Sequence, residues 1–209
     1  MRIAIIDLGI NNLASLTRVL GSIDNNFQIE IVPSGDIESS TPRPQLLILP
    51  GVGNFGAAIE ILRSRNLYSY INEHLHREGK VIGICLGMQL LLQGSEESPG
   101  ARGLGIIPGI ARRLRRKIEK VPNVGWNEIS FSKESHKFYD LNPHSNFYFT
   151  HSFYADVSDE FIIATSTHGD SIFPAIIGNE SVVGIQFHPE KSGLEGKSFL
   201  KRIIEVQIR

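Results

Sequence analysis

The sequence predicts an α/β fold with a doubly wound, mostly parallel sheet flanked by helices and with antiparallel strands in its second half. Short apolar runs alternate with helical patterns up to about residue 93, as they do in successive βαβ units. The runs at 2–7 and 45–49 are continuous, which is typical of parallel strands buried on both faces. After residue 103 the apolar runs shorten and are separated by Gly, Pro and Asn, which favours antiparallel or mixed strands.

The individual elements follow from the same patterns. After the strand at 2–7, helical spacing of Leu13, Leu16, Leu20 and Ile23 predicts a helix. The rest of the first half is predicted to contain strands at 28–32, 45–49 and 81–84 and helices at 55–64 and 67–77. The second half is predicted to contain strands around 105–108, 121–126, 147–150 and 161–165, and a closing helix over 195–206.

With 209 residues, 41% of them hydrophobic and 21% charged, the chain has the size and composition of one globular domain over 1–209. The formal net charge of −1 argues against a nucleic-acid binder that works by bulk electrostatics. No apolar run approaches the roughly 18 residues of a membrane span, and the N-terminal stretch has no cleavable-signal pattern. We therefore expect a cytoplasmic protein that binds neither nucleic acid nor membrane.

The stretch from Lys80 to Leu92 carries the strongest chemical signal, because it holds the only cysteine of the chain. Gly83, Cys85 and Gly87 have the spacing of a nucleophile elbow, in which a strand turns sharply into a helix and holds the corner side chain outward. The helix N-terminus would offer N–H donors to an oxyanion there. One cysteine can form no internal disulfide and is too few for a thiolate metal site, so the alternative is a buried structural cysteine.

A second unusual backbone follows the strand at 45–49. The loop from Pro50 to Gly56 has three glycines and one proline in seven residues, which indicates a close approach or an unusual bend. An ordinary connection between strand and helix is the alternative. Asp7, this loop and Cys85 all follow predicted strands, and such ends meet at one edge of a parallel sheet. One crevice could therefore hold all three.

His188 and Glu190 form the second chemical stretch. Side chains two apart on an extended segment share one face, and Pro189 between them favours extended backbone at His188. With Cys85 they have the types of a triad, in which the histidine moves the proton and the carboxylate orients it. A zinc site is the alternative for this pair, but it lacks further ligands at suitable spacing.

Two other stretches could contact a partner. The segment 112–120 contains six basic residues, which favours a solvated strand pair over an anion-binding surface. Trp126, the only tryptophan, stands in a loop-like sequence rich in Gly, Pro and Asn. Such a tryptophan is as easily a partner contact as a core residue, because its area is large and its N–H needs a polar partner.

The elbow from Gly83 to Gln89 and the pair His188 and Glu190 resemble the class I, triad-type glutamine amidotransferases. Within that family the chain resembles the glutaminase subunits of imidazole glycerol phosphate synthases. The stretches that carry this second resemblance are spread over the chain: Pro50–Gly53, Gly125–Asn127, Tyr148–Ser152 and Gln186–Ser192.

The resemblance implies that glutamine is hydrolysed to glutamate and ammonia without metal or cofactor. The ammonia would pass through a tunnel to a (βα)8-barrel cyclase, the other subunit of a heterodimer. That cyclase makes imidazole glycerol phosphate for histidine biosynthesis, together with aminoimidazole carboxamide ribotide. The implied roles are a triad of Cys85, His188 and Glu190; oxyanion donors at Gly53 and Leu86; glutamine contacts at Gln89, Glu97, His151 and Ser152; and a cyclase face at Asn12, Trp126, Tyr148 and Lys191.

Four positions depart from the usual pattern of these subunits. Leu8 and Asn11 replace a common tyrosine and glycine, and Asn123 and Val124 replace a common His-Met pair. None belongs to the triad, so the departures concern the partner more than the chemistry. The alternatives are a paralogous glutaminase that serves another biosynthetic acceptor, a non-catalytic interaction partner, and a cysteine hydrolase on the same fold.

Overall fold

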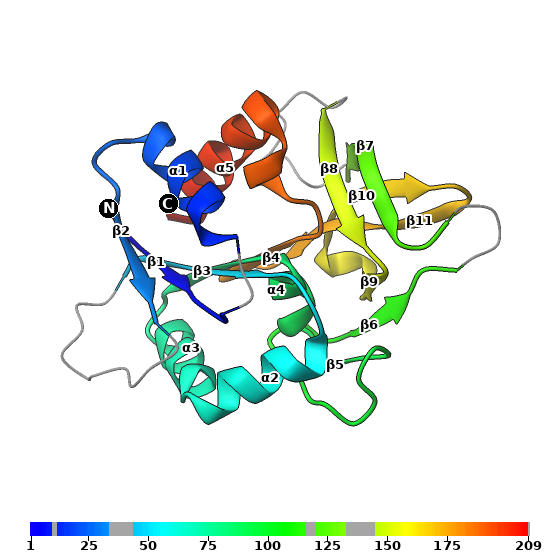
Figure 1. The fold of residues 1–209 in the computed structure, drawn as a ribbon, viewed down its shortest axis with the longest axis horizontal. Coiled ribbons are helices and arrows are strands. Elements are labelled where there is room, and N and C mark those ends of the chain that lie inside the picture. Colours follow the sequence, from blue (N-terminus) through cyan, green and yellow to red (C-terminus); the bar gives the residue numbers. More distant parts are fainter. Residues whose placement is uncertain (10–11, 34–43, 116–119, 133–144, 209) are drawn as a thin grey trace.

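The computed structural model describes residues 1–9, 12–33, 44–115, 120–132 and 145–208 (Figure 1). Among these residues, nine strands form one sheet in the order β2-β1-β3-β4-β12-β11-β10-β7-β8, and three form a small sheet in the order β5-β6-β9. No helix in this described part of the chain is both long enough and apolar enough to cross a bilayer.

The large sheet has a parallel half and an antiparallel half. The five strands from β2 to β12 pair in parallel, and the pairs from β12 through β8 are antiparallel. This arrangement confirms the predicted fold class. The strands are β1 (Arg2–Ile6), β2 (Gln28–Val32), β3 (Leu46–Gly51), β4 (Lys80–Cys85), β7 (Asn123–Phe131), β8 (Asn146–His151), β10 (Ile162–His168), β11 (Ser171–Gly178) and β12 (Val182–Ile185).

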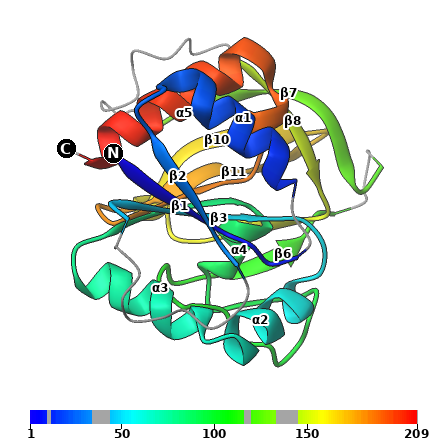
Figure 2. The same ribbon diagram turned by 60° about the vertical axis from the view of Figure 1, so that its left-hand side comes forward.

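Helices cover both faces of the parallel half (Figures 1 and 2). One face carries α1 and α5, and the other carries α2, α3 and α4. Alternate residues of β1 divide between two cores: Ile3 and Ile5 pack with α1 and α5, whereas Ala4 and Ile6 pack with α2 and α3. The helices are α1 (Leu13–Ile23), α2 (Phe55–Ser64), α3 (Leu67–His76), α4 (Leu86–Leu90) and α5 (Gly193–Ile208), with short 3₁₀ helices η2 (Asp159–Phe161) and η3 (Pro189–Lys191).

One prediction for the second half was wrong. The run at 105–108 is a loop. Its N–H groups at Gly105 and Ile107 donate to carbonyls of the two residues that follow α4. Within the described residues, the basic segment 112–120 contributes two exposed arginines to β6 (Ile110–Arg113), which pairs with β5 (Gly94–Ser95) and β9 (Phe153–Asp156), in keeping with a solvated strand. Trp126 lies in strand β7, which agrees with the strand predicted around 121–126, although the sequence around it looks loop-like. Residues 116–119 of the basic segment lie outside the described residues.

Cys85 stands at the sharp corner between β4 and α4, with φ of 54° and ψ of −107°. Such a backbone is strained for any residue with a side chain. The neighbouring glycines are required by space, because a Cβ on Gly87 would lie 1.7 Å from the carbonyl oxygen of Leu49. A Cβ on Gly83 would lie 2.6 Å from the carbonyl oxygen of Gly87. The corner at Cys85 therefore depends on direct backbone contacts between β3, β4 and α4.

Replacing Gly87 with alanine tests this packing. Because the added carbon meets backbone and not a movable side chain, we expect the free energy of unfolding to fall by about 3 kcal/mol or more. Gly21→Ala is the control, since it makes the same change in α1 with no atom within 4 Å. It should be neutral or stabilising by up to about 1 kcal/mol. Urea unfolding measures both, and equal effects would contradict the close approach.

Candidate active site

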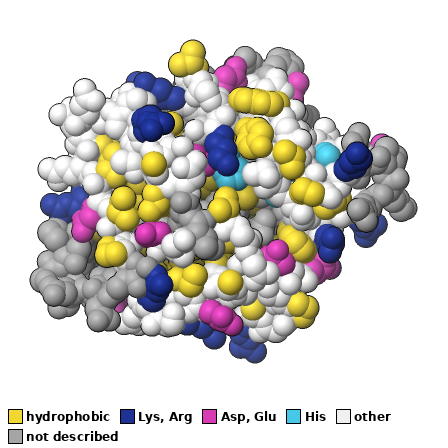
Figure 3. Space-filling model, in the orientation of Figure 1, with side chains coloured by type: hydrophobic (Ala, Val, Ile, Leu, Met, Phe, Trp, Pro, Cys, Tyr) yellow, Lys and Arg dark blue, Asp and Glu magenta, His cyan; other side chains and the backbone are white. Residues whose placement is uncertain are grey.

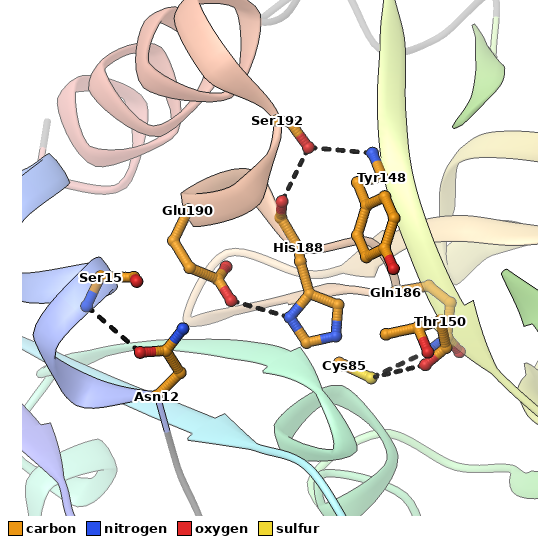
Figure 4. A network of polar contacts seen from close by, with 9 residues as sticks. All are labelled: Asn12, Ser15, Cys85, Tyr148, Thr150, Gln186, His188, Glu190 and Ser192. Carbon is orange, nitrogen blue, oxygen red and sulfur yellow. Dashed lines mark hydrogen bonds and ion pairs between the residues drawn. The ribbon is translucent and has the colours of Figure 1, made fainter. Parts of the chain in front are cut away.

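Cys85 converges with His188 and Glu190, which come from one segment far from it in the sequence (Figure 4). Strand β12 pairs in parallel with β4 and aligns Ile185 with Ile84, so the segment after β12 lies beside Cys85. The imidazole of His188 lies between the other two side chains, and its Nδ1 is 2.8 Å from Glu190 Oε1. Its Nε2 is buried and has no hydrogen-bond partner within the described residues.

We predicted that His188 and Glu190 share one face of an extended segment, and this part of the prediction was wrong. His188 is extended, but Glu190 lies in the 3₁₀ turn η3, which begins at Pro189. Ser192 holds this turn, because its hydroxyl donates to the carbonyl of His188 at 2.7 Å and accepts the N–H of Tyr148 at 3.0 Å. The carboxylate therefore reaches the imidazole by a turn whose shape is fixed from two sides.

The surroundings of His188 favour its charged form. The side chains of His188 and Glu190 are only 2% and 7% exposed, so solvent screens their interaction little. Burial lowers the pKa of His188, but Cys85 and Glu190 outweigh burial and raise that pKa to about 10. The imidazole of His188 is accordingly protonated at neutral pH.

The sulfur of Cys85 has two polar neighbours besides His188. It lies 3.9 Å from the carbonyl oxygen of Thr150 and 3.8 Å from Nε2 of Gln186. Neither residue was among the predicted site residues. Gln186 belongs to the Gln186–Ser192 stretch that carried part of the resemblance, so a signal for it was present in the sequence.

A cavity of about 430 Å³ opens at Cys85. It collects the predicted oxyanion and glutamine-contact residues, but Asp7 does not line it, so the crevice holds two of the three strand-end features and not all three. The predicted residues in its wall are Gly53, Leu86, Gln89, Glu97, His151, Ser152 and Lys191.

Glu97 and Gln89 in this wall are already hydrogen-bonded. The Glu97 carboxylate accepts the N–H of Phe55 at 2.6 Å, at the first turn of α2. The Gln89 amide donates to the carbonyl of Phe153 at 3.1 Å, which leaves the amide oxygen to face other groups. Both side chains are therefore held in place before any ligand arrives.

A model of the class-I glutamine amidotransferase family matches residues 4–206 of the chain. The chain belongs to the class I glutamine amidotransferase family. It is 37% identical over 213 residues to the imidazole glycerol phosphate synthase subunit HisH of Thermotoga maritima, covering 100% of this chain and 98% of that protein. It is 41% identical over 201 residues to subunit HisH of Pyrococcus furiosus, covering 96% of each.

The fold of the chain is that of solved family members. A glutamine amidotransferase structure from Thermotoga maritima matches with a TM-score of 0.67 at 17% identity, covering 100% of this chain and 98% of that one. At this identity the likeness shows the shared fold alone.

Three of the residues predicted to face a cyclase form a surface cluster in this amidotransferase. Trp126 is 57% exposed, and its ring centroid is 6.1 Å from that of Tyr148. Lys191 Nζ lies 5.8 Å from the Tyr148 ring centroid. Asn12 lies at the start of α1, a helix that contacts η3, and its side chain accepts the N–H of Ser15. Hydrophobic side chains are exposed on the face in Figure 3, some of them beside Lys or Arg.

The departures from the usual pattern occupy different environments. Leu8 is buried, Val124 is exposed on the same face of β7 as Trp126, and Asn11 lies outside the described residues. Asn123 is only 1% exposed, and its amide lies 3.0 Å from Nε2 of His151.

His151 is held as a neutral imidazole. Its Nδ1 lies 2.9 Å from the carbonyl of Phe153, which can only accept, so Nδ1 carries the proton and Nε2 accepts from the Asn123 amide. Burial lowers the pKa of His151 to about 4, against the opposing effect of the bond to Phe153.

The low pKa of His151 predicts a pH dependence of stability. Between about pH 6.5 and 4 the unfolded chain binds a proton that the folded chain does not, so His151 makes the folded state less stable as pH falls. The loss should be on the order of 3 kcal/mol across this window. Urea unfolding of His151→Gln should lack this component, whereas exposed His76→Gln should keep it. Parallel pH profiles for wild type and His151→Gln would contradict the assignment.

Proposed function

We propose that this chain is the glutaminase subunit of an imidazole glycerol phosphate synthase and hydrolyses glutamine at Cys85. The observation that carries the proposal is the strained corner that presents the only cysteine to a buried His188–Glu190 pair at the mouth of a cavity. The 37–42% identity to several HisH subunits supports the choice of partner and pathway.

The chemistry follows from these positions. The sulfur of Cys85, as thiolate, attacks the carboxamide carbon of glutamine and forms a tetrahedral intermediate. When the C–N bond breaks, His188 gives its proton to the leaving ammonia, and a γ-glutamyl thioester remains. Water then attacks the thioester and gives a proton to His188, and glutamate leaves as the thiolate is restored. Glu190 orients the imidazole and stabilises its charge throughout.

The remaining roles belong to the same proposal and follow the family resemblance. The N–H of Leu86, first in α4, is one donor to the oxyanion, and the N–H of Gly53 becomes the second when the loop at Gly53 reverses. Gln89, Glu97, His151 and Ser152 hold the amino-acid end of glutamine. Trp126, Tyr148, Lys191 and Asn12 face the cyclase, which receives the ammonia in a heterodimer.

Replacing Cys85 with alanine separates the two activities of the complex. Glutamine hydrolysis and glutamine-dependent synthesis should fall by a factor of about 10⁴ or more, because the variant lacks the sulfur that attacks the carboxamide. Synthesis from added ammonia should be unchanged, since it needs only the cyclase. Ser166→Ala is the control, because it truncates a buried side chain in β10 that does not line the cavity. Glutamine hydrolysis by Cys85→Ala would show that the nucleophile lies elsewhere.

The loop at Gly53 predicts how a cyclase controls the reaction. Gly53 has φ of 109°, and reversal of the Val52–Gly53 peptide would bring this φ to negative values, as between type II and type I turns. We assign the present conformation to the resting state and the reversed one to the state with N–H toward the oxyanion. Bound cyclase and its ligand then favour the reversed state and raise turnover by about 10² to 10³, the effect of one donor.

Gly53→Ala tests this assignment, because alanine disfavours positive φ and keeps the N–H. The variant should hydrolyse glutamine faster than wild type as a free subunit and should be activated less by the cyclase. Gly9→Ala provides the control, since Gly9 shares the positive φ of Gly53, has no atom within 4 Å of an added Cβ and does not line the cavity. Steady-state kinetics of free subunit, complex, and complex with cyclase ligand give the comparison. Unchanged or lower basal turnover in Gly53→Ala would contradict it.

A further inference from the structure

Gln186 is a buried polar side chain that the triad chemistry leaves without a role. It follows β12 directly and is 0% exposed. Its Nε2 lies 3.8 Å from the Cys85 sulfur, and its buried Oε1 has no hydrogen-bond partner within the part of the chain that the structure describes. A buried amide with an unpaired oxygen costs stability, and an apolar side chain of similar length would avoid that cost.

The sulfur needs a donor at this position once it loses its proton. As a thiol, Cys85 can donate to the carbonyl of Thr150, 3.9 Å away. As a thiolate, the sulfur would have the negative end of that carbonyl dipole beside it. The amide nitrogen of Gln186 lies beside this sulfur and can donate a hydrogen bond to it (Figure 4).

We propose that Gln186 is a catalytic residue that donates a hydrogen bond from its amide N–H to the Cys85 thiolate. This inference rests on the proposed function, because Gln186 would donate to Cys85, the nucleophile of the proposed reaction. The register of β12 against β4 fixes the contact, since Ile185 lies opposite Ile84 and the next residues, Gln186 and Cys85, are brought together. The amide thus lies one residue beyond the paired strand, where the backbone N–H of Gln186 donates to the carbonyl of Ala175 in β11.

The sole cysteine makes the contact directly measurable. Every alkylation by iodoacetamide reports on Cys85, which lines a cavity that a small reagent can enter. The titratable groups around the sulfur are His188 with its partner Glu190, and His151, Glu97 and Lys191 in the cavity wall. All five are unchanged in a Gln186 variant, so a difference between two pH profiles reports on the amide.

Two substitutions with side chains of nearly the same length as glutamine test whether Gln186 acts as a hydrogen-bond donor or only fills space. Gln186→Met removes the donor and should raise the pH of half-maximal alkylation by about one to two units, the effect expected for a hydrogen bond to a charged group. Gln186→Glu places an acceptor there and should raise it further. Both should lower glutamine turnover in the complex more than they change KM. Gln186→Met should also leave the urea midpoint equal or higher, because the unpaired oxygen is gone.

Gln207→Met is the matched control, since Gln207 in α5 is also buried with an unpartnered amide oxygen among the described residues. It should leave the alkylation profile of wild type unchanged. An unshifted profile in Gln186→Met, or equal profiles for the Met and Glu variants, would overturn the proposal. Alkylation requires no glutamine turnover, so a wild-type complex that fails to hydrolyse glutamine would refute the proposed function and leave this test of Gln186 intact.

Discussion

The strained backbone of Cys85 is the constraint on which the rest of the site depends. A positive φ at a residue with a side chain is unfavourable, and here it is imposed by strand β4 turning into α4 within one residue. The turn is possible because Gly87 lies against the Leu49 carbonyl with no room for a Cβ. The result is a sulfur held at the carboxyl end of the sheet, where α4 begins and the cavity opens.

The partners of the sulfur come from the two halves of the sheet. The parallel pairing of β12 with β4 brings Gln186 and His188 to Cys85, and antiparallel β8 brings Thr150 and His151 to the same cavity. The junction of β12 with β11 is where strand direction changes. A site at this junction can combine a helix N-terminus from one half with carbonyl and imidazole groups from the other, and neither half alone contains them.

The sequence allowed the fold class to be predicted, because continuous apolar runs identify parallel strands and punctuated runs identify antiparallel ones. It failed at 105–108, where apolar residues are buried in a loop bonded to the α4 segment, since burial looks the same in a loop and a strand. Motif spacing placed Cys85, His188 and Glu190 together, but not the η3 turn that joins the last two. The contacts of Gln186 with Cys85 and of Asn123 with His151 depend on strand register, which no local pattern reveals.

The central claim is that the sulfur of Cys85 is the nucleophile toward the glutamine carboxamide. The most direct measurement is reaction of the complex with a chloroketone analogue of glutamine, followed by peptide mapping. The account predicts one adduct per subunit on Cys85, formed in step with loss of glutamine hydrolysis and prevented by excess glutamine. Loss of hydrolysis with Cys85 unmodified, or modification that glutamine does not slow, would contradict it.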